Sequence, residues 1–264
     1  MALSFAKHPS LVAYVTCGDP DLATTRDIVL AAIGAGAEVI ELGVPFSDPL
    51  ADGPVIQRSS ERALQRGTTL ADVLQLAKDV RKQSHAGLII FSYLNPILRM
   101  GLTKFAVAAQ DAGIDGALIT DQPVEEADTY LTEMRKRKLA TVFLVAPTSP
   151  DERLKQIAKA STGFVYAVSR TGVTGARKQL PDDARDLVRR VRKYTNLPIA
   201  VGFGISTPEQ FAAVGEFAEA AVVGSAIVET IERNHGKEAE AVAEFVRQLS
   251  VGSRRSSAKT AVRR

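Results

Sequence analysis

The sequence predicts a single-domain α/β protein of the (β/α)8, or TIM-barrel, class. Apolar runs typical of buried strands alternate with segments of helical periodicity along residues 11–249. Eight such strand–helix units fit into the 264 residues, and this is the number of units at which a parallel sheet closes into a barrel. An open doubly wound sheet is the alternative, because it also alternates strands with helices.

The expected elements follow one another in a regular order. The strands are short apolar runs, expected at 11–16, 37–43, 87–93, 115–121, 140–147, 163–168, 198–202 and 219–224. The helices have apolar residues at i, i+3 and i+4 spacing or capping residues at their ends, and are expected at 21–33, 70–80, 104–112, 123–137, 151–160, 181–194, 207–214 and 226–249. No linker interrupts this order, which favours one domain.

The segment after the second expected strand holds the first candidates for chemistry. Residues 41–54 read ELGVPFSDPLADGP, so that three prolines stiffen a loop in which neither helix nor strand is expected. Glu41 lies near the C-terminal end of the buried strand, where a carboxylate is costly unless it is paired or used. The loop also carries Asp48 and Asp52. These acids are candidates for proton transfer.

A barrel would bring several further residues to the same face. The C-terminal ends of the strands form the active face of such barrels. The residues expected on or just above that face are Glu41, Asp52, Tyr93, Asp121, Tyr166, Gly175, Gly204 and Gly224. Their convergence indicates a site more strongly than any one motif does.

Two glycine turns predict a phosphate site. VGFGISTP at 201–208 contains Gly204, and VGSA at 223–226 contains Gly224 and Ser225. Glycine lets backbone amides approach an anion, and each turn opens a helix whose N-terminus favours negative charge. The loops after strands seven and eight are the usual phosphate cradle of this barrel. Glycines that only turn the chain are the alternative.

The loop SRTGVTG at 169–175 follows the sixth expected strand. Its glycines and small polar residues predict a mobile loop that closes over the substrate, with Gly175 as a further amide donor to the phosphate. An ordinary surface connection is the alternative.

The remaining composition excludes several classes of site. The three histidines lack metal-ligand spacing, Cys17 is the single cysteine and has no neighbouring base, and no expected strand clearly ends in lysine. We therefore expect no metal and no covalent intermediate. No apolar run reaches the roughly 18 residues that span a bilayer, and no signal-peptide pattern opens the chain. We expect a cytoplasmic protein that does not bind membranes.

The net charge of +3 comes from the end of the chain. Segment 251–264 holds five basic residues and no acidic one, so that residues 1–250 are close to neutral and give no indication of nucleic-acid binding. The segment is also poor in apolar residues, which predicts disorder. We expect a barrel over 1–250 and a basic, disordered tail over 251–264.

The proline loop and several other motifs resemble the tryptophan synthase alpha chain family. Besides ELGVPFSDPLADGPVIQ at 41–57, the matching motifs are YVTCGDP at 14–20, YLNP at 93–96, DQPVEE at 121–126, APTS at 146–149, SRTGVTG at 169–175, VGFGI at 201–205 and GSA at 224–226. The resemblance covers about residues 11–249 and implies a lyase. The implied reaction is retro-aldol cleavage of indole-3-glycerol phosphate to indole and glyceraldehyde 3-phosphate, with no cofactor on this chain.

The resemblance also implies roles for individual residues. Glu41 would protonate indole C3, Asp52 would accept the indole N–H, and Asp48 would brace the loop. The implied substrate contacts are Tyr14, Phe91, Tyr93, Leu118, Leu144, Tyr166 and Phe203, with Thr174 meeting Asp52 on closure, and the implied phosphate contacts are Gly175, Gly204, Gly224 and Ser225. The segment before Leu11 is shorter than the leading helix that usually plugs the barrel in this family.

The resemblance further implies a partner. Members of the family pass indole to a beta chain that carries pyridoxal phosphate, so we expect an alpha2beta2 assembly. A stand-alone lyase that releases free indole is one alternative, and a non-catalytic subunit that activates a beta chain is another. Measuring activity without a beta chain distinguishes the stand-alone lyase from the alpha subunit. The presence of Glu41 and Asp52 argues against the non-catalytic subunit. Another phosphate-binding barrel is disfavoured by the proline loop.

Overall fold

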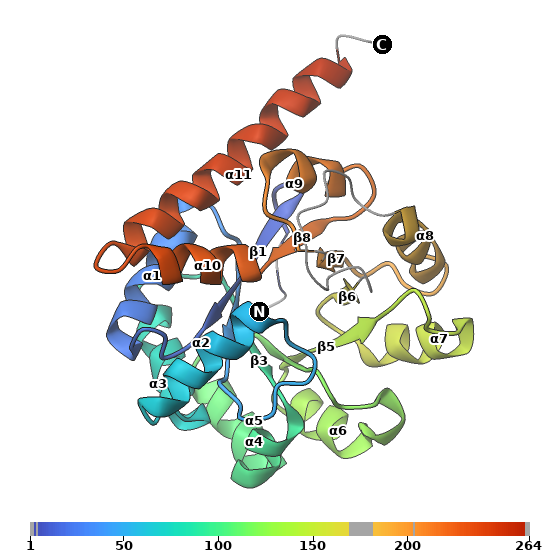
Figure 1. The fold of residues 1–264 in the computed structure, drawn as a ribbon. Coiled ribbons are helices and arrows are strands. Elements are labelled where there is room, and N and C mark those ends of the chain that lie inside the picture. Colours follow the sequence, from blue (N-terminus) through green and yellow to red (C-terminus); the bar gives the residue numbers. More distant parts are fainter. Residues whose placement is uncertain (1–2, 4, 169–181, 203, 262–264) are drawn as a thin grey trace.

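A closed barrel of parallel strands forms the centre of the molecule, and helices surround it (Figure 1). The computed structural model describes residues 3, 5–168, 182–202 and 204–261, with only the backbone course at 182 and from 251 onward. The strands are β1 (Ser10–Thr16), β2 (Val39–Gly43), β3 (Gly87–Ser92), β4 (Gly116–Ile119), β5 (Ala140–Val145), β6 (Val165–Val168), β7 (Ile199–Gly202) and β8 (Ala220–Val223). They pair in sequence order, and β8 pairs with β1. The predicted barrel is confirmed and the open sheet is excluded.

Each expected helical segment contains a helix. The helices are α1 (Leu22–Ala35), α2 (Pro54–Gln65), α3 (Leu70–Arg81), α4 (Leu94–Met100), α5 (Leu102–Asp111), the 3-10 turn η1 (Val124–Glu126), α6 (Asp128–Lys136), α7 (Asp151–Ala160), α8 (Asp182–Val191), α9 (Pro208–Val214), α10 (Ser225–Arg233) and α11 (Glu238–Ala261). The expected helix at 123–137 is divided into η1 and α6.

Two helices were not expected from the sequence, α2 and α4. Pro54 is the first residue of α2, a position where proline is favoured because the backbone N–H there has no intrahelical acceptor. The prolines therefore exclude a helix within the loop but begin one at its end. In α4, Pro96 likewise lies in the first turn after the N-cap residue, Tyr93. Gly101, with φ of 93°, separates α4 from α5.

The C-terminal region also differs from the expectation. The helical region expected at 226–249 consists of two helices, α10 and α11, and the connection between them contains Gly236 with φ of 80°. Residues 251–264 were expected to be disordered, but α11 continues to Ala261. Residues 251–261 lack proline but include Gly252 and three serines, so helix propensity alone does not account for the extension. Over its earlier turns, α11 packs against α1, α9 and α10.

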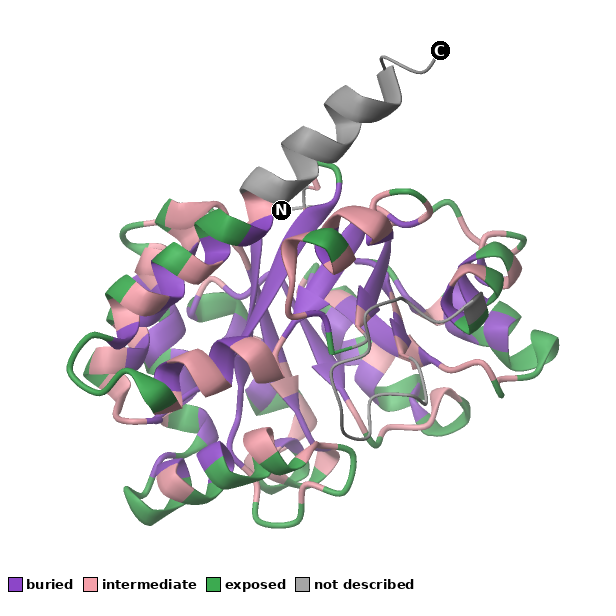
Figure 2. Cartoon of the chain, turned by 45° about the horizontal axis from the view of Figure 1, so that its top comes forward, coloured by how far each residue is buried: buried purple, intermediate pink, exposed green. Residues whose placement is uncertain are grey.

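Alternation along the strands divides the core into two layers. Ile40 and Leu42 on β2 belong to the outer layer, between the barrel and the helices. Val39 belongs to the inner layer, which fills the barrel. Glu41 stands between the two outer residues and therefore points into the barrel, because side chains alternate along a strand. Figure 2 shows burial concentrated on the strands and on the helix faces toward them.

The short N-terminal segment covers the inner layer. Leu3 and Phe5 pack against this layer, and the Phe5 ring meets Phe164 edge-on with centroids 5.7 Å apart. Phe164 directly precedes β6, so this contact lies at the N-terminal end of the barrel. Leu3 and Phe5 thus cover part of this end of the barrel. No helix in the described part of the chain is long and apolar enough to cross a membrane.

Candidate active site

Glu41 is the most unusual ionisable group at the C-terminal half of the barrel. It lies in β2 between Tyr14 of β1 and Ile89 of β3. Its side chain is fully buried, and neither carboxyl oxygen has a hydrogen-bond partner among the described residues. Burial raises the pKa of the Glu41 carboxyl to about 8, because the charged form loses its hydration. At neutral pH the group is therefore protonated and able to donate a proton.

Asp52 is held in the loop between β2 and α2 by a tyrosine. The Tyr93 hydroxyl donates to Asp52 Oδ2 at 3.1 Å, and the Ala51 N–H donates to the Tyr93 hydroxyl at 2.9 Å. The Tyr93 ring stacks on Phe46, with centroids 4.9 Å apart. Burial raises the pKa of Asp52 to about 6, while the bond from Tyr93 opposes this shift. Asp52 is thus largely ionised at neutral pH.

Both acids face one cavity of about 170 Å³. Apolar and aromatic side chains form most of its wall. The lining residues are Tyr14, Glu41, Ala51, Asp52, Gly53, Ile56, Phe91, Thr120, Leu144, Tyr166, Val168, Val222 and Gly224. A slot of this kind suits a flat apolar ring, with the two acids as the groups that orient it and react with it.

Glycines on neighbouring strands make room for the two tyrosines of the wall. A Cβ at Gly43 would collide with the Tyr14 ring, and a Cβ at Gly202 would lie 2.6 Å from the Tyr166 hydroxyl oxygen. The Tyr14 ring also meets Phe91 edge-on, with centroids 5.1 Å apart. Burial is the main cause that raises the pKa values of both tyrosines, so their hydroxyls stay neutral.

The turn after β8 is the best-formed candidate for the phosphate end. Gly224 lines the cavity, and Ser225 is the first residue of α10. The Ile227 and Val228 N–H groups bond to the Gly224 carbonyl, so that the earlier amides of α10 face the helix entrance. Gly204 follows β7 with φ of 65°, is exposed, and does not line the cavity. Of these residues only Gly224 lines the cavity that the two acids face, and Ser225 follows it directly in the chain.

Other predicted residues occupy different positions. Phe203, Thr174 and Gly175 lie outside the described residues. Tyr93 contacts Asp52 and does not line the cavity, and Leu118 lies in the inner core layer. Asp48, expected to brace the loop, is exposed and accepts from the hydroxyl of its neighbour Ser47 at 2.5 Å.

Sequence reasoning missed several lining residues. Val168, Val222 and Thr120 each stand two residues after or before a residue that the sequence analysis had named, Tyr166, Gly224 and Leu118. The two-residue period of strands was therefore the available signal. Ile56 was missed because it belongs to α2, a helix that was not among those expected from the sequence.

The described residues offer little for other kinds of chemistry. They contain no group of three or more histidine, cysteine, aspartate or glutamate side chains able to hold a metal ion. Cys17 is buried, and burial raises the pKa of its thiol far above the usual value. A thiol in that state is a poor nucleophile.

Comparisons with known proteins agree on one family. A family model described as tryptophan synthase alpha chain matches residues 2–257. A tryptophan synthase alpha chain of Solibacter usitatus is 55% identical over 225 residues, which cover 85% of this chain and 84% of that protein. Another, of Geotalea uraniireducens, is 46% identical over 251 residues, which cover 95% and 94%.

Solved structures agree with the sequence comparisons. A mutant tryptophan synthase alpha-subunit of Pyrococcus furiosus superposes with a TM-score of 0.86 at 40% identity, covering 92% of this chain and 98% of that one. A Mycobacterium tuberculosis tryptophan synthase chain gives 0.87 at 34% identity, covering 94% and 93%. The chain belongs to the tryptophan synthase alpha chain family, and is a lyase of tryptophan biosynthesis that cleaves indole-3-glycerol phosphate by a retro-aldol reaction.

Proposed function

We propose that Glu41 and Asp52 carry out the cleavage, Glu41 as the proton donor to indole C3 and Asp52 as the acceptor of the indole N–H. One observation supports this most directly: both acids face the same cavity, with pKa values of about 8 for Glu41 and about 6 for Asp52. Near neutral pH one acid is therefore protonated and the other is ionised. This is the pairing that a reaction with one proton donor and one fixed negative charge requires.

The steps balance with these two groups. Glu41 transfers its proton to C3 of the indole ring, and the ring nitrogen becomes positively charged. Asp52 accepts a hydrogen bond from that N–H and stabilises the charge as it develops. The bond from C3 to the glyceryl carbon then breaks, and its electron pair returns to the ring. The glyceryl hydroxyl becomes the aldehyde and gives its proton to Glu41, which restores the acid.

The remaining contacts of the substrate follow from the shape of the cavity. The indole ring would lie between Tyr14, Phe91 and Tyr166, where a flat ring replaces water against apolar surface. The phosphate would bind at Gly224 and Ser225, because the entrance of α10 presents amides and the positive end of the helix dipole. Gly204, in the turn after β7, would add a contact to the phosphate, together with the predicted contacts of Thr174, Gly175 and Phe203.

The family assignment implies a beta-chain partner. We propose an alpha2beta2 assembly in the cytoplasm, in which indole-3-glycerol phosphate is the substrate of this chain. The pyridoxal phosphate would be bound by the beta chain and not by this one. The family name is compatible with a chain that works through its own acids.

A spectrophotometric assay of indole release tests the catalytic roles. Glu41→Gln should lower kcat by about a thousandfold, within the range for loss of a general acid, and Asp52→Asn by about a hundredfold, as for loss of one charge-stabilising group. Asp48→Asn is the matched control, because Asp48 belongs to the same loop but is exposed. Without a beta chain, this variant should keep the parent rate. Full activity of Glu41→Gln would exclude the proposed mechanism.

The same assay separates the alternatives. We expect slow cleavage by the isolated chain and a strong increase when a matching beta chain is added. High activity that the beta chain does not change would indicate a stand-alone lyase. No cleavage under either condition, with activation of the beta chain preserved, would indicate a non-catalytic activating subunit.

A further inference from the structure

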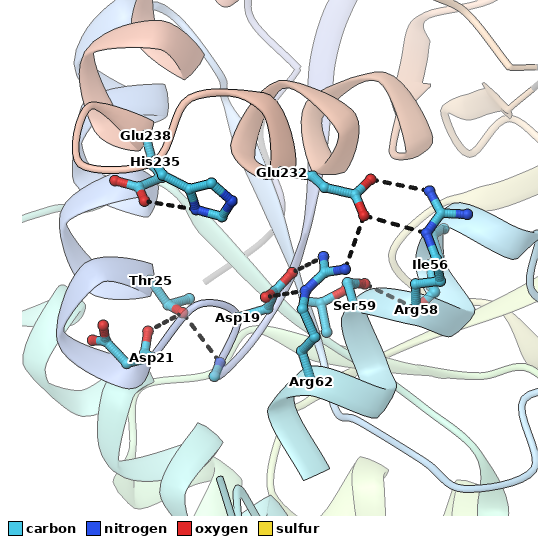
Figure 3. Close-up of polar contacts among 12 residues, drawn as sticks. Asp19, Asp21, Thr25, Ile56, Arg58, Ser59, Arg62, Glu232, His235 and Glu238 are labelled. Atoms are coloured by element: carbon cyan, nitrogen blue, oxygen red, sulfur yellow. Dashed lines mark hydrogen bonds and ion pairs between the residues drawn. The ribbon is translucent and has the colours of Figure 1, made fainter. Parts of the chain in front are cut away.

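A network of two arginines and two acids joins the loop after β1 with the helices α2 and α10 (Figure 3). Arg62 of α2 forms a bidentate ion pair with Asp19, which lies in the connection after β1. Its Nε donates to Asp19 Oδ1 at 2.8 Å and its Nη2 donates to Asp19 Oδ2 at 2.7 Å. Its third nitrogen, Nη1, donates to Glu232 Oε1 of α10 at 2.9 Å. Arg58, also on α2, donates from Nη2 to Glu232 Oε2 at 3.0 Å. One guanidinium therefore connects the loop after β1 with α2 and α10.

The first end of this connection is linked to the catalytic aspartate. α2 begins two residues after Asp52, and the Gln57 side-chain amide donates to the Asp52 carbonyl at 2.8 Å. Ile56, in the first turn of α2, lines the cavity. The Ser59 hydroxyl donates to the Ile56 carbonyl at 2.8 Å and lies 2.7 Å from the Thr16 hydroxyl of β1. The position of α2 therefore determines where Asp52 is presented.

The second end is linked to the phosphate turn. α10 begins at Ser225, directly after Gly224, and Glu232 lies two turns further along the same helix. The N-terminal ends of α2 and α10 also lie close together at the cavity, as a Cβ at Gly224 would lie 3.7 Å from Ile56 Cδ1. Each helix is a stiff element, so a contact at its outer turns also fixes its N-terminal end.

We propose that the Arg62–Glu232 ion pair is a positioning contact, which sets the spacing between Asp52 and the phosphate turn at Gly224. This inference rests on the proposed roles of those two places in the substrate site. Asp19 is 3% exposed, and its bidentate contact with Arg62 fixes the orientation of the guanidinium group. The remaining nitrogen, Nη1, is therefore directed at Glu232 of α10. A substrate that spans both ends then meets two groups at a fixed separation.

Glu232→Met is the informative variant, because it removes both oxygens and leaves the pair of Arg62 with buried Asp19 intact. Glu229→Met is the matched control. Glu229 lies on the same helix and pairs with Arg233 at 3.3 Å, but that ion pair connects residues of α10 only. Both variants lose one negative charge and keep a long side chain in α10. Thermal unfolding of both variants verifies that they are folded.

Calorimetric titration with three ligands distinguishes a changed distance between the two ends of the site from a loss of affinity throughout the site. Indole contacts one end of the site, glycerol phosphate contacts the other, and indole-3-propanol phosphate spans both without being cleaved. For Glu232→Met we expect the Kd of the spanning ligand and the KM of the substrate to rise by about tenfold, as for a small misplacement of binding groups. The Kd values of the two short ligands should stay within about twofold of the parent. Glu229→Met should behave as the parent with all three ligands.

Two results would overturn the inference. One is an unchanged Kd of the spanning ligand in Glu232→Met, and the other is an equal loss of affinity for all three ligands. Asp52→Asn, assayed in parallel, separates this failure from that of the proposed function. If Asp52→Asn loses turnover while Glu232→Met binds the spanning ligand normally, only the positioning role fails. If Asp52→Asn retains full turnover, the proposed mechanism fails, and the positioning role that rests on it fails too.

Discussion

Tyr93 donates its hydroxyl to the Asp52 carboxylate at 3.1 Å, and the same oxygen accepts the Ala51 N–H at 2.9 Å. One phenol thus binds both the side chain of the aspartate and the backbone next to it. The ring is fixed in turn by its stack on Phe46. The family resemblance implies Tyr93 as part of the indole slot, whereas these contacts make it a residue that orients Asp52.

Tyr93→Phe should therefore act on Asp52 while leaving the ring stack in place. We expect kcat to fall by about tenfold, in line with the loss of a hydrogen bond to a charged group, with a smaller change in KM. The bond from Tyr93 lowers the pKa of Asp52, so its removal should move the acid limb of the rate profile to higher pH. Steady-state kinetics of indole release across pH measure both effects.

Tyr130→Phe is the control for that variant. Tyr130 is also buried, but its hydroxyl donates to the Ala117 carbonyl, outside the cavity. Its removal should leave the acid limb unchanged. An unshifted acid limb in Tyr93→Phe, or an equal shift in both variants, would contradict the orienting role.

The barrel was predictable from local patterns, but this contact was not. Alternating strand and helix signals, repeated eight times, are sufficient to predict the closed sheet, and the cost of burying Glu41 indicates a reactive group on β2. The bond between Tyr93 and Asp52 joins residues 41 positions apart. Nothing in either local sequence specifies that a phenol from the end of β3 will reach the loop after β2.

Two other differences have separate causes, one local and one not. Ile56 became a wall residue because Pro54 begins a helix, and the same proline had indicated an irregular loop. The network of Asp19, Arg62 and Glu232 combines residues from three distant segments, and each of them alone reads as an ordinary surface charge. Pairing of this kind depends on how the helices pack around the barrel, which a single sequence does not reveal.

The rate of cleavage should have a bell-shaped dependence on pH. Asp52 has to be ionised, so kcat/KM should fall below about pH 6. Glu41 has to be protonated, so kcat/KM should also fall above about pH 8. The maximum should lie near pH 7. The second ionisation of a phosphate monoester also lies near pH 6, and binding of glycerol phosphate across pH is therefore the control. If the affinity for glycerol phosphate falls by the same factor below about pH 6 as kcat/KM does, ionisation of the phosphate and not of Asp52 causes the fall.

Glu41 should make the folded protein less stable as the pH rises. Its pKa is about 8 in the folded chain and has a reference value of 4.5, so between these values the folded state binds more protons than the unfolded state. The contribution of this group to the free energy of unfolding should be fully present below about pH 4.5. It should then decrease by about 1.4 kcal/mol per pH unit up to about pH 8.

Glu41→Gln removes this pH dependence while keeping the shape of the side chain. We expect the free energy of unfolding of the variant, measured in urea, to exceed that of the parent by an amount that grows from pH 5 to pH 8. Asp48→Asn is the control, because the carboxylate it removes is exposed. A difference between Glu41→Gln and the parent that stays constant with pH would show that Glu41 is not buried in its neutral form.

Arg62 should also be needed for stability, because Asp19 is 3% exposed and faces its guanidinium. Arg62→Met leaves a buried carboxylate without its partner, which should lower the free energy of unfolding by about 3 kcal/mol. This value is at the low end for a broken buried ion pair, because Arg62 is itself partly exposed. Arg58→Met should change it little, because Arg58 is half exposed. Adding Asp19→Asn to Arg62→Met should restore part of the loss, since the stranded charge is then removed. Urea unfolding of the parent, Arg62→Met, Asp19→Asn and the double variant measures this coupling. Additive losses in the double variant would show that Arg62 and Asp19 act independently.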